Sequence, residues 1–117
     1  MTNSEKHAAL LELAAEYWNK ADLAKHGRVE SIASIRKRVY ALFPGTESNA
    51  IVRVSKDTYG DPPKGKRFIV RYRQLNPLAG DRSLNPTADL IPCRKNGDPY
   101  ANGRRVRCSL FLLEPDA

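Results

Sequence analysis

The sequence has little of what builds metal sites, disulfide frameworks or membrane spans. Its 117 residues include two cysteines, two histidines, one tryptophan and one methionine. Two cysteines, with the histidines in distant segments, lack the ligand spacing of a zinc site, so we expect no metal and no cofactor. No apolar run approaches the roughly 18 residues of a membrane helix. Glutamates interrupt the apolar N-terminal stretch, which is untypical of a signal peptide. We therefore expect a cytoplasmic protein without membrane contact.

Motifs of common enzyme families are also missing. The chain contains no G-x-S-x-G, no phosphate-binding loop, no G-x-G-x-x-G and no H-E-x-x-H string. Each histidine lies at a predicted helix terminus, where a surface or capping role is more common than catalysis. We therefore expect a protein that is not an enzyme. A small ribonuclease-type toxin, which would stabilise phosphate charge with Arg, Lys and Tyr alone, is the enzymatic alternative.

Proline and glycine are almost absent from the first part of the chain. Residues 1–43 contain no proline and a single glycine, whereas the remaining 74 residues contain all eight prolines and six of the seven glycines. This break predicts a helical part over 1–43 and a strand-and-loop part over 44–117. The length predicts that both belong to one domain, 1–117, because two separate cores would each be too small.

The helical part contains two amphipathic patterns. Thr2-Asn3-Ser4-Glu5 has the T-x-x-E form of a capping box, which opens a helix. That helix either continues to Gly27 or breaks near residues 19–20 into a third, short helix. A further helix is predicted over residues 29–43. The expected core positions of the two helices are Leu10, Leu11, Ala14, Tyr17, Trp18, Ala21 and Ala24 in the first, and Ile32, Ile35, Val39 and Leu42 in the second.

Alternating apolar and polar residues predict strands in the second part. Residues 50–55 and 67–75 alternate, and the turn formers between them predict a hairpin with a long loop. Residues 76–88 predict an irregular connection. A short strand over 90–94 is restricted to an edge by Pro92. Residues 104–113 predict the last strand. We expect Cys93 and Cys108 to be buried, reduced neighbours on the core side of the last two strands.

These elements predict an α+β fold. Two or three N-terminal helices would pack on one face of a three- or four-stranded antiparallel sheet. The sheet positions expected in the core are Val52, Val54, Phe68, Val70, Tyr72, Val106, Cys108, Leu110 and Leu112. The same alternation places apolar Ile51, Ile69, Phe111 and Leu113 on the opposite face, together with six arginines.

Positive charge is concentrated in the second half of the chain. The sequence carries 20 Lys+Arg against 13 Asp+Glu, a net charge of +7, and residues 59–117 account for 11 of these basic and 6 of these acidic groups. A local cationic surface points to a polyanion, and arginine forks match phosphate geometry. The candidate contacts on the sheet face and its hairpin loop are Arg53, Lys64, Lys66, Arg67, Arg71, Arg73, Arg105, Arg107 and Phe111.

A second basic cluster lies on the predicted second helix. Arg36, Lys37 and Arg38 are consecutive, and residues 20–38 faintly resemble a helix-turn-helix with a shortened turn. The resemblance implies a recognition helix over 29–43 and duplex DNA as the ligand. Glycine-linked helix pairs are, however, common in proteins that do not bind DNA.

The sequence therefore favours a small basic nucleic-acid-binding protein, such as a regulator, that contacts phosphates of DNA or RNA through an arginine-rich sheet face and hairpin loop. The alternative is a protein-binding inhibitor or adaptor of phage or mobile-element type. Its arginine and apolar face would dock on an acidic partner surface, because arginine and aromatic residues are typical interface anchors.

Overall fold

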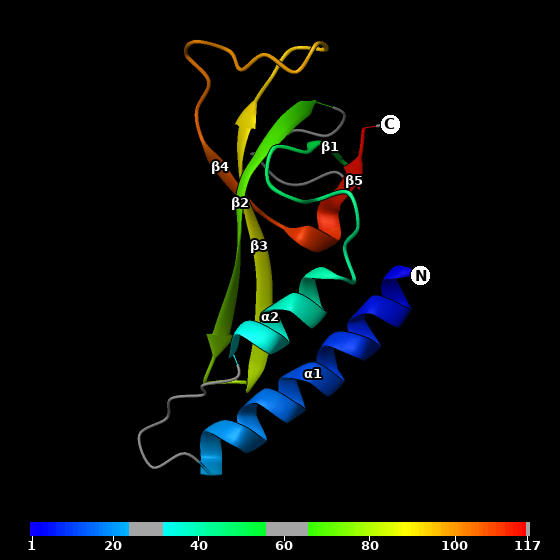
Figure 1. Cartoon of the computed structure of the whole chain (residues 1–117), viewed down its shortest axis with the longest axis vertical. Coiled ribbons are helices and arrows are strands. Elements are labelled where there is room, and N and C mark those ends of the chain that lie inside the picture. Colours follow the sequence, from blue (N-terminus) through cyan, green and yellow to red (C-terminus); the bar gives the residue numbers. More distant parts are fainter. Residues whose placement is uncertain (24–31, 56–65, 117) are drawn as a thin grey trace. The chain divides into compact units, whose positions relative to one another are not determined.

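The computed structural model describes residues 1–23, 32–55 and 66–116. These form an α+β structure of two helices and one five-stranded antiparallel sheet (Figure 1). The elements are α1 (Asn3–Leu23), α2 (Ile32–Tyr40), β1 (Ile51–Val54), β2 (Arg67–Leu78), β3 (Ser83–Pro92), β4 (Val106–Ser109), the 3₁₀ turn η1 (Leu110–Leu112) and β5 (Leu113–Pro115). The chain divides into two compact units. We call Met1–Leu42 with Leu75–Asn85 the helical unit, and Phe43–Gln74 with Pro86–Ala117 the sheet unit.

Helix α1 begins as its sequence predicts. The Thr2 hydroxyl accepts a hydrogen bond from the Glu5 amide at 3.1 Å, and the Glu5 carboxylate accepts one from the Thr2 amide at 3.0 Å. These reciprocal bonds confirm the capping box. The helix continues without a break to Leu23, so the break considered near residues 19–20 does not occur.

The buried stripe of α1 differs slightly from the predicted one. Leu10, Ala14, Tyr17 and Ala21 are buried as expected, but Leu11 is 68% exposed and Leu13 is buried in its place. Helix α2 begins at Ile32 and buries Ile35 and Val39. Its predicted first residues, and Ala24, lie outside the described part of the chain. The chain leaves the helix after Tyr40 rather than at Phe43.

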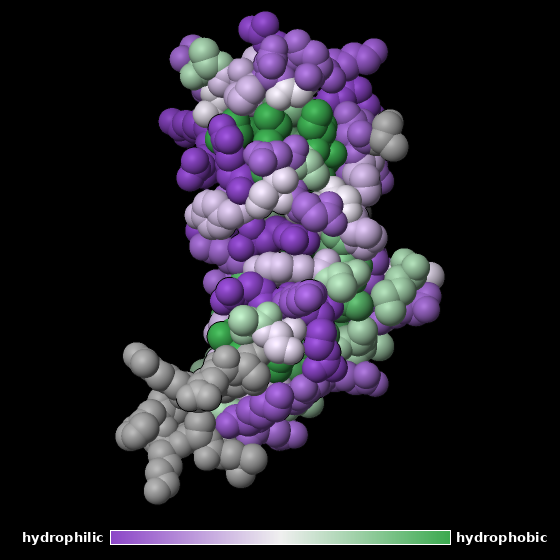
Figure 2. All heavy atoms as spheres, in the orientation of Figure 1, coloured by the Kyte–Doolittle hydropathy of each residue, from purple (hydrophilic) through white to green (hydrophobic). Residues whose placement is uncertain are grey.

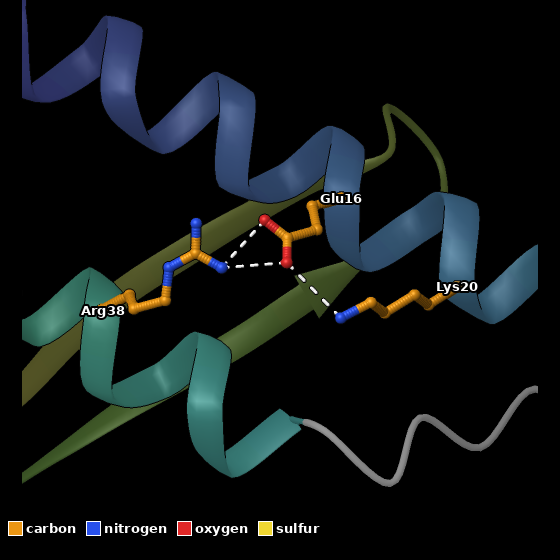
Figure 3. Close-up of polar contacts among 3 residues, drawn as sticks. All are labelled: Glu16, Lys20 and Arg38. Atoms are coloured by element: carbon orange, nitrogen blue, oxygen red, sulfur yellow. Dashed lines mark hydrogen bonds and ion pairs between the residues drawn. The ribbon is translucent and has the colours of Figure 1, made fainter.

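Two polar clusters organise the helical unit. An Arg38 nitrogen lies 2.8 and 2.9 Å from the two carboxylate oxygens of Glu16, which Lys20 approaches at 3.4 Å (Figure 3). This cluster connects α2 to α1. In the second cluster, Arg82 of the β2–β3 turn binds the Asp22 carboxylate and lies 5.5 Å from the centre of the Trp18 ring. The Trp18 indole also donates to the Ser83 carbonyl at 3.2 Å, so α1 holds this turn at three points.

The sheet has five strands in the order β4-β3-β2-β1-β5, not the three or four predicted. Two differences account for the change. Residues 76–88 are not an irregular connection, because β2 and β3 extend through them and only residues 79–82 form the turn. The predicted last strand, 104–113, is divided by η1 into β4 and β5.

The short η1 turn forces the sheet to curl. It joins β4 to β5 with three residues, yet these strands lie at opposite ends of the strand order (Figure 1). In a flat sheet the outer strands would be about 19 Å apart, given a spacing of about 4.8 Å between strands. Three residues of 3₁₀ helix span only about 6 Å. The two outer strands therefore lie closer together than in a flat sheet, and the Ser55 amide and hydroxyl, next to the β1–β5 ladder, both bond to the Leu112 carbonyl.

One face of the sheet forms the core of the sheet unit. Its fully or almost fully buried residues are Val52, Val54, Phe68, Val70, Ala88, Leu90, Cys108 and Leu110. The strand register confirms the shared face, because Val52 pairs with Phe68 and Ala88 pairs with Cys108. The predicted core is confirmed for five of its strand residues and for Leu110, whereas Val106 and Leu112 are half-buried. The packing of the helices on this face remains a prediction.

Tyr72 departs from the predicted core because β2 contains a β-bulge. The Cys93 amide bonds to the Arg67 carbonyl, whereas Leu78 and Ser83 end the two strands at the turn. The 12 residues 67–78 of β2 therefore lie opposite only the 11 residues 83–93, so β2 carries one extra residue. Consecutive exposed residues, Arg71 and Tyr72, mark its position. The prediction that Tyr72 is buried is wrong: it is 38% exposed.

Pro92 and the cysteines also take unexpected places. Strand β3 lies between β2 and β4, so the predicted edge position is wrong, and Pro92 is tolerated as its last residue. Cys93 and Cys108 are both buried free thiols, as expected, but the predicted core side is wrong for Cys93, which lies opposite Arg67 on the other face. They do not pair, because Cys108 lies opposite Ala88 and Cys93 lies opposite Pro99. Burial raises the pKa of the Cys108 thiol to about 11, which disfavours the reactive thiolate.

Candidate nucleic-acid interface

Arginines from three strands meet on the face opposite the core, which we call the outer face. Arg53 lies directly opposite Arg67 in the β1–β2 ladder. The Arg67 carbonyl accepts from the Cys93 amide, which places Arg67 opposite Cys93. Asp89 is four residues before Cys93 on β3 and so shares this face, and it pairs with Arg107 of β4. The register therefore places Arg53, Arg67 and Arg107 together.

Three carboxylates share the outer face with the arginines. The two oxygens of Asp116 lie 2.7 Å from the Nε of Arg53 and 2.7 Å from the Nε of Arg67. Glu114 of β5 stands directly opposite Arg53. Asp89 accepts from the Arg107 Nε at 3.0 Å. Sequence reasoning missed these groups because none of them is near an arginine of the first two strands in the sequence.

The β1–β5 side of the outer face is consequently close to neutral. Arg53 and Arg67 are partly buried and face the carboxylates of Glu114 and Asp116. The Arg67 guanidinium, with Arg53, lowers the pKa of Asp116, so this carboxylate is charged across the physiological range. Apolar residues on this side of the face are covered: Ile69 and Cys93 are buried, and Gly97 of the following turn approaches Ile51.

Free positive charge gathers on the β3–β4 side, around Asp89. We call Arg71, Tyr72, Asp89, Arg105 and Arg107 the Asp89 cluster. Asp89 is 5% exposed, and a hydrogen bond from Tyr72 lowers its pKa, followed by the hydrogen bond from Arg107. Asp89 in turn raises the pKa of Arg107, whose side chain is 57% exposed. Arg105 also lowers the pKa of Asp89, and Arg71 is exposed on the adjacent strand β2.

The cluster is a prearranged cationic surface. A charge-assisted bond to a buried acceptor fixes the direction of the Arg107 fork. Arg71 and Arg105 make no ion pair with any other residue of the described ranges. Such an arrangement can bind phosphate or carboxylate groups without first breaking its own contacts.

The other predicted contacts are distributed over both units. Beyond the bulge the alternation is inverted, and Arg73 bonds to the buried Thr46 hydroxyl at 3.5 Å instead of joining the outer face. Phe111 lies in η1 and packs edge-on against Phe43, 4.9 Å between ring centres. Leu113 pairs with Val54 and therefore lies on the core face rather than the outer face. Lys66 is exposed, and Lys64 falls outside the described residues.

The basic cluster of α2 belongs to the helical unit. Arg36 and Lys37 are exposed, whereas Arg38 bonds to Glu16. Residues 20–23 form the last turn of the long helix α1, so they are not a separate short helix. The turn of the proposed helix-turn-helix lies outside the described ranges, and that resemblance stays a prediction.

Two exposed tyrosines of the sheet unit were not among the predicted contacts. Tyr72 is 38% and Tyr100 is 48% exposed, and the Arg94 guanidinium lies 5.5 Å from the centre of the Tyr100 ring. The alternation of residues 67–75 assigned Tyr72 to a core position, so the sequence gave no indication that this side chain is exposed. Tyr100 lies between two Asn-Gly turns, which gave a signal for a loop but none for function.

Comparison with known proteins gives no relative: no family model, no curated protein and no solved structure matches the chain. Among the described residues, no helix is long and apolar enough to cross a membrane. Within the same ranges, no group of three or more His, Cys, Asp and Glu residues is placed to hold a metal ion. In the view of Figure 2 most of the surface is hydrophilic, with a small hydrophobic group in its upper part.

Proposed function

We propose that this chain is a nucleic-acid-binding protein that contacts phosphates through the Asp89 cluster. The observation that carries the proposal is that the exposed Arg105 and Arg107 lie beside the buried Asp89 carboxylate, with the exposed Arg71 on the adjacent strand β2. Arginine offers a planar fork that suits phosphate oxygens, and a fixed fork loses less side-chain entropy when it binds. The proposal narrows the predicted face: Arg53 and Arg67 are balanced by acids and act mainly in structure.

The test is a binding titration with a matched control. The double variant Arg71→Gln/Arg105→Gln removes two charges and leaves the Arg107–Asp89 ion pair in place. The control Arg36→Gln/Lys37→Gln removes two exposed charges from α2. Fluorescence anisotropy with a labelled oligonucleotide at low salt measures both. We expect about a tenfold loss of affinity for the first variant and little change for the control. Equal losses in both variants would show that only net charge matters.

A protein-binding inhibitor or adaptor, such as one of phage or mobile-element type, is the second candidate. This candidate is favoured by the balance of charges on the β1–β5 side, where the acids Glu114 and Asp116 lie beside Arg53 and Arg67. Such a mixed surface suits a protein partner better than a phosphate chain. A pull-down from host lysate with and without nuclease separates the two: a partner that survives nuclease favours this candidate.

A further inference from the structure

Two arginines stand directly opposite each other on the β1–β5 side of the outer face. Arg53 of β1 pairs with Arg67 of β2 in the strand register, and their side chains are only 36% and 26% exposed. Like charges directly opposite on neighbouring strands repel each other, and partial burial weakens the screening by solvent. An anion close to both guanidinium groups relieves this repulsion.

Asp116 supplies that anion from the same chain. Its amide bonds to the Ile51 carbonyl at 3.0 Å, which continues the β1–β5 register by one residue beyond Pro115. One oxygen of its carboxylate lies 2.7 Å from the Nε of Arg53 and the other lies 2.7 Å from the Nε of Arg67. Asp116 therefore occupies the position between the two arginines that an external anion would take.

The Asp116 carboxylate is an incomplete ligand for this pair. It accepts a hydrogen bond from the Arg67 Nε, but the buried Arg53 Nε has no hydrogen-bond partner among the described residues. Since 2.7 Å is within hydrogen-bond distance, the direction of the Arg53 N–H is what prevents the bond. A carboxylate holds its two oxygens in one plane, whereas a phosphate group adds oxygens above and below that plane. A phosphate group can therefore satisfy both Nε donors.

We infer that Arg53 and Arg67 form a phosphate-binding site, which Asp116 closes from within the chain as an internal substitute for the ligand. This site lies apart from the Asp89 cluster, so the inference goes beyond the proposed function and does not rest on it. In the closed state the arginine pair serves the structure of the sheet. A phosphate group binds by displacing the carboxylate, and its apparent affinity is lowered by the fraction of molecules in which the site is closed.

Four variants separate the opening of the site from a change in net charge. Asp116→Ala removes the closing group, and Asp116→Asn removes its charge while keeping its size. Glu114→Ala is the matched control: it also removes one carboxylate from the outer face, but Glu114 forms no ion pair with another described residue. Asp116→Ala/Arg67→Gln has the net charge of wild type and lacks the arginine pair. Circular dichroism verifies that each variant is folded.

The measurement is the rise of the urea midpoint in about 20 mM inorganic phosphate, relative to chloride of the same ionic strength. The double variant reports the general stabilisation that phosphate gives any protein. We expect the rise to be largest in Asp116→Ala and Asp116→Asn, about twice that of wild type or more. Wild type and Glu114→Ala should show equal, smaller rises, and the double variant should show the smallest.

The same variants are then titrated with labelled oligo-dT at low salt, which distinguishes phosphates of nucleic acid from free phosphate. If the site accepts the nucleic-acid backbone, Asp116→Ala binds about fivefold more tightly than wild type, and Glu114→Ala gains no more than about twofold from its net charge. A gain in phosphate alone assigns the site to free or small phosphates.

The outcomes distinguish this inference from the proposed function. Equal midpoint rises in Asp116→Ala and in the double variant would refute the phosphate site. Equal rises in Asp116→Ala and Glu114→Ala would show that only net charge matters, and a wild-type rise as large as that of Asp116→Ala would refute closure by Asp116. If phosphate gives the expected order while no variant binds an oligonucleotide, the inference stands and the proposed function fails.

Discussion

Gly45 illustrates how strictly a single position of the sheet unit is determined. Its φ is +82°, and a Cβ placed there would lie 2.4 Å from the Cγ of Pro115 in β5. Gly45→Ala therefore combines backbone strain with a collision against the edge strand. We expect the free energy of unfolding to fall by about 1–3 kcal/mol in urea denaturation.

A matched glycine gives the control for this variant. Around Gly80, in the β2–β3 turn, no atom lies within 4 Å of the corresponding Cβ position. Gly80→Ala should therefore change stability by less than about 0.5 kcal/mol. Equal destabilisation by the two substitutions would contradict the close approach of β5 to Gly45.

Asp89 predicts a pH dependence of stability with a definite sign. Tyr72 and Arg107 hold its folded pKa below the ordinary value, so the folded chain binds fewer protons at this group than the unfolded chain. The ionised Asp89 contributes its full stabilisation of the folded chain above the ordinary Asp pKa of about 3.9. This stabilisation is lost as the pH falls from there through the lower folded pKa. Asp89→Asn should lower the free energy of unfolding by about 1–2 kcal/mol at pH 7. The loss stays this small because solvent screens the exposed partner Arg107.

The measurement is urea denaturation of wild type and variant from pH 7 down to pH 3. The stability difference between them should shrink toward the acid end. Glu12→Gln, which changes an exposed residue of α1, serves as the control and should leave the curve unchanged. A stability difference that is constant with pH would show that the Asp89 charge has no special partners in the folded chain.

At the scale of elements, Arg82 supplies two of the three contacts that hold the turn between β2 and β3 to α1. Arg82 takes a φ of +54°, binds Asp22 and lies over the Trp18 ring. Arg82→Ala removes an exposed ion pair and a cation–π contact, which together contribute about 1 kcal/mol. Trp18 is the single tryptophan, so its fluorescence reports this contact directly. We expect a lower urea midpoint and a red shift of native emission; an unchanged emission and midpoint, as expected for Arg36→Ala, would refute the contact.

The elements show which parts of the fold local patterns can predict. The capping box, most of the helix core and the β1–β2 pairing follow from spacing alone, and they were predicted; the burial of Leu13 in place of Leu11 was not. The extension of β2 and β3 through the Asn-Pro dipeptides was not predicted from the sequence. Each strand is stabilised there by its partner across the hairpin, as in the bond from the Asn76 side chain to the Asn85 carbonyl. The division of the last strand by η1 depends on the pairing of β5 with β1, which no local pattern records.

At the scale of the whole molecule, the charge pattern predicted which arginines lie on the outer face but not which carboxylates neutralise them. Alternation correctly placed Arg53, Arg67 and Arg107 on one face. It could not place Asp116 between the first two, since that contact depends on β5 pairing with β1. One bulge then exchanged the places of Tyr72 and Arg73. The free charge and the exposed aromatic group of the site are both consequences of long-range pairing.

The salt dependence of oligonucleotide binding tests the central claim most directly. If Arg71, Arg105 and Arg107 each displace a counterion from a phosphate, the slope of log K against log salt for a single strand is about −2, at about −0.7 for each contact. The Arg71→Gln/Arg105→Gln variant should then give a slope shallower by about 1.4. Undetectable binding at low salt, or a slope that the double variant leaves unchanged, would contradict phosphate recognition by the Asp89 cluster.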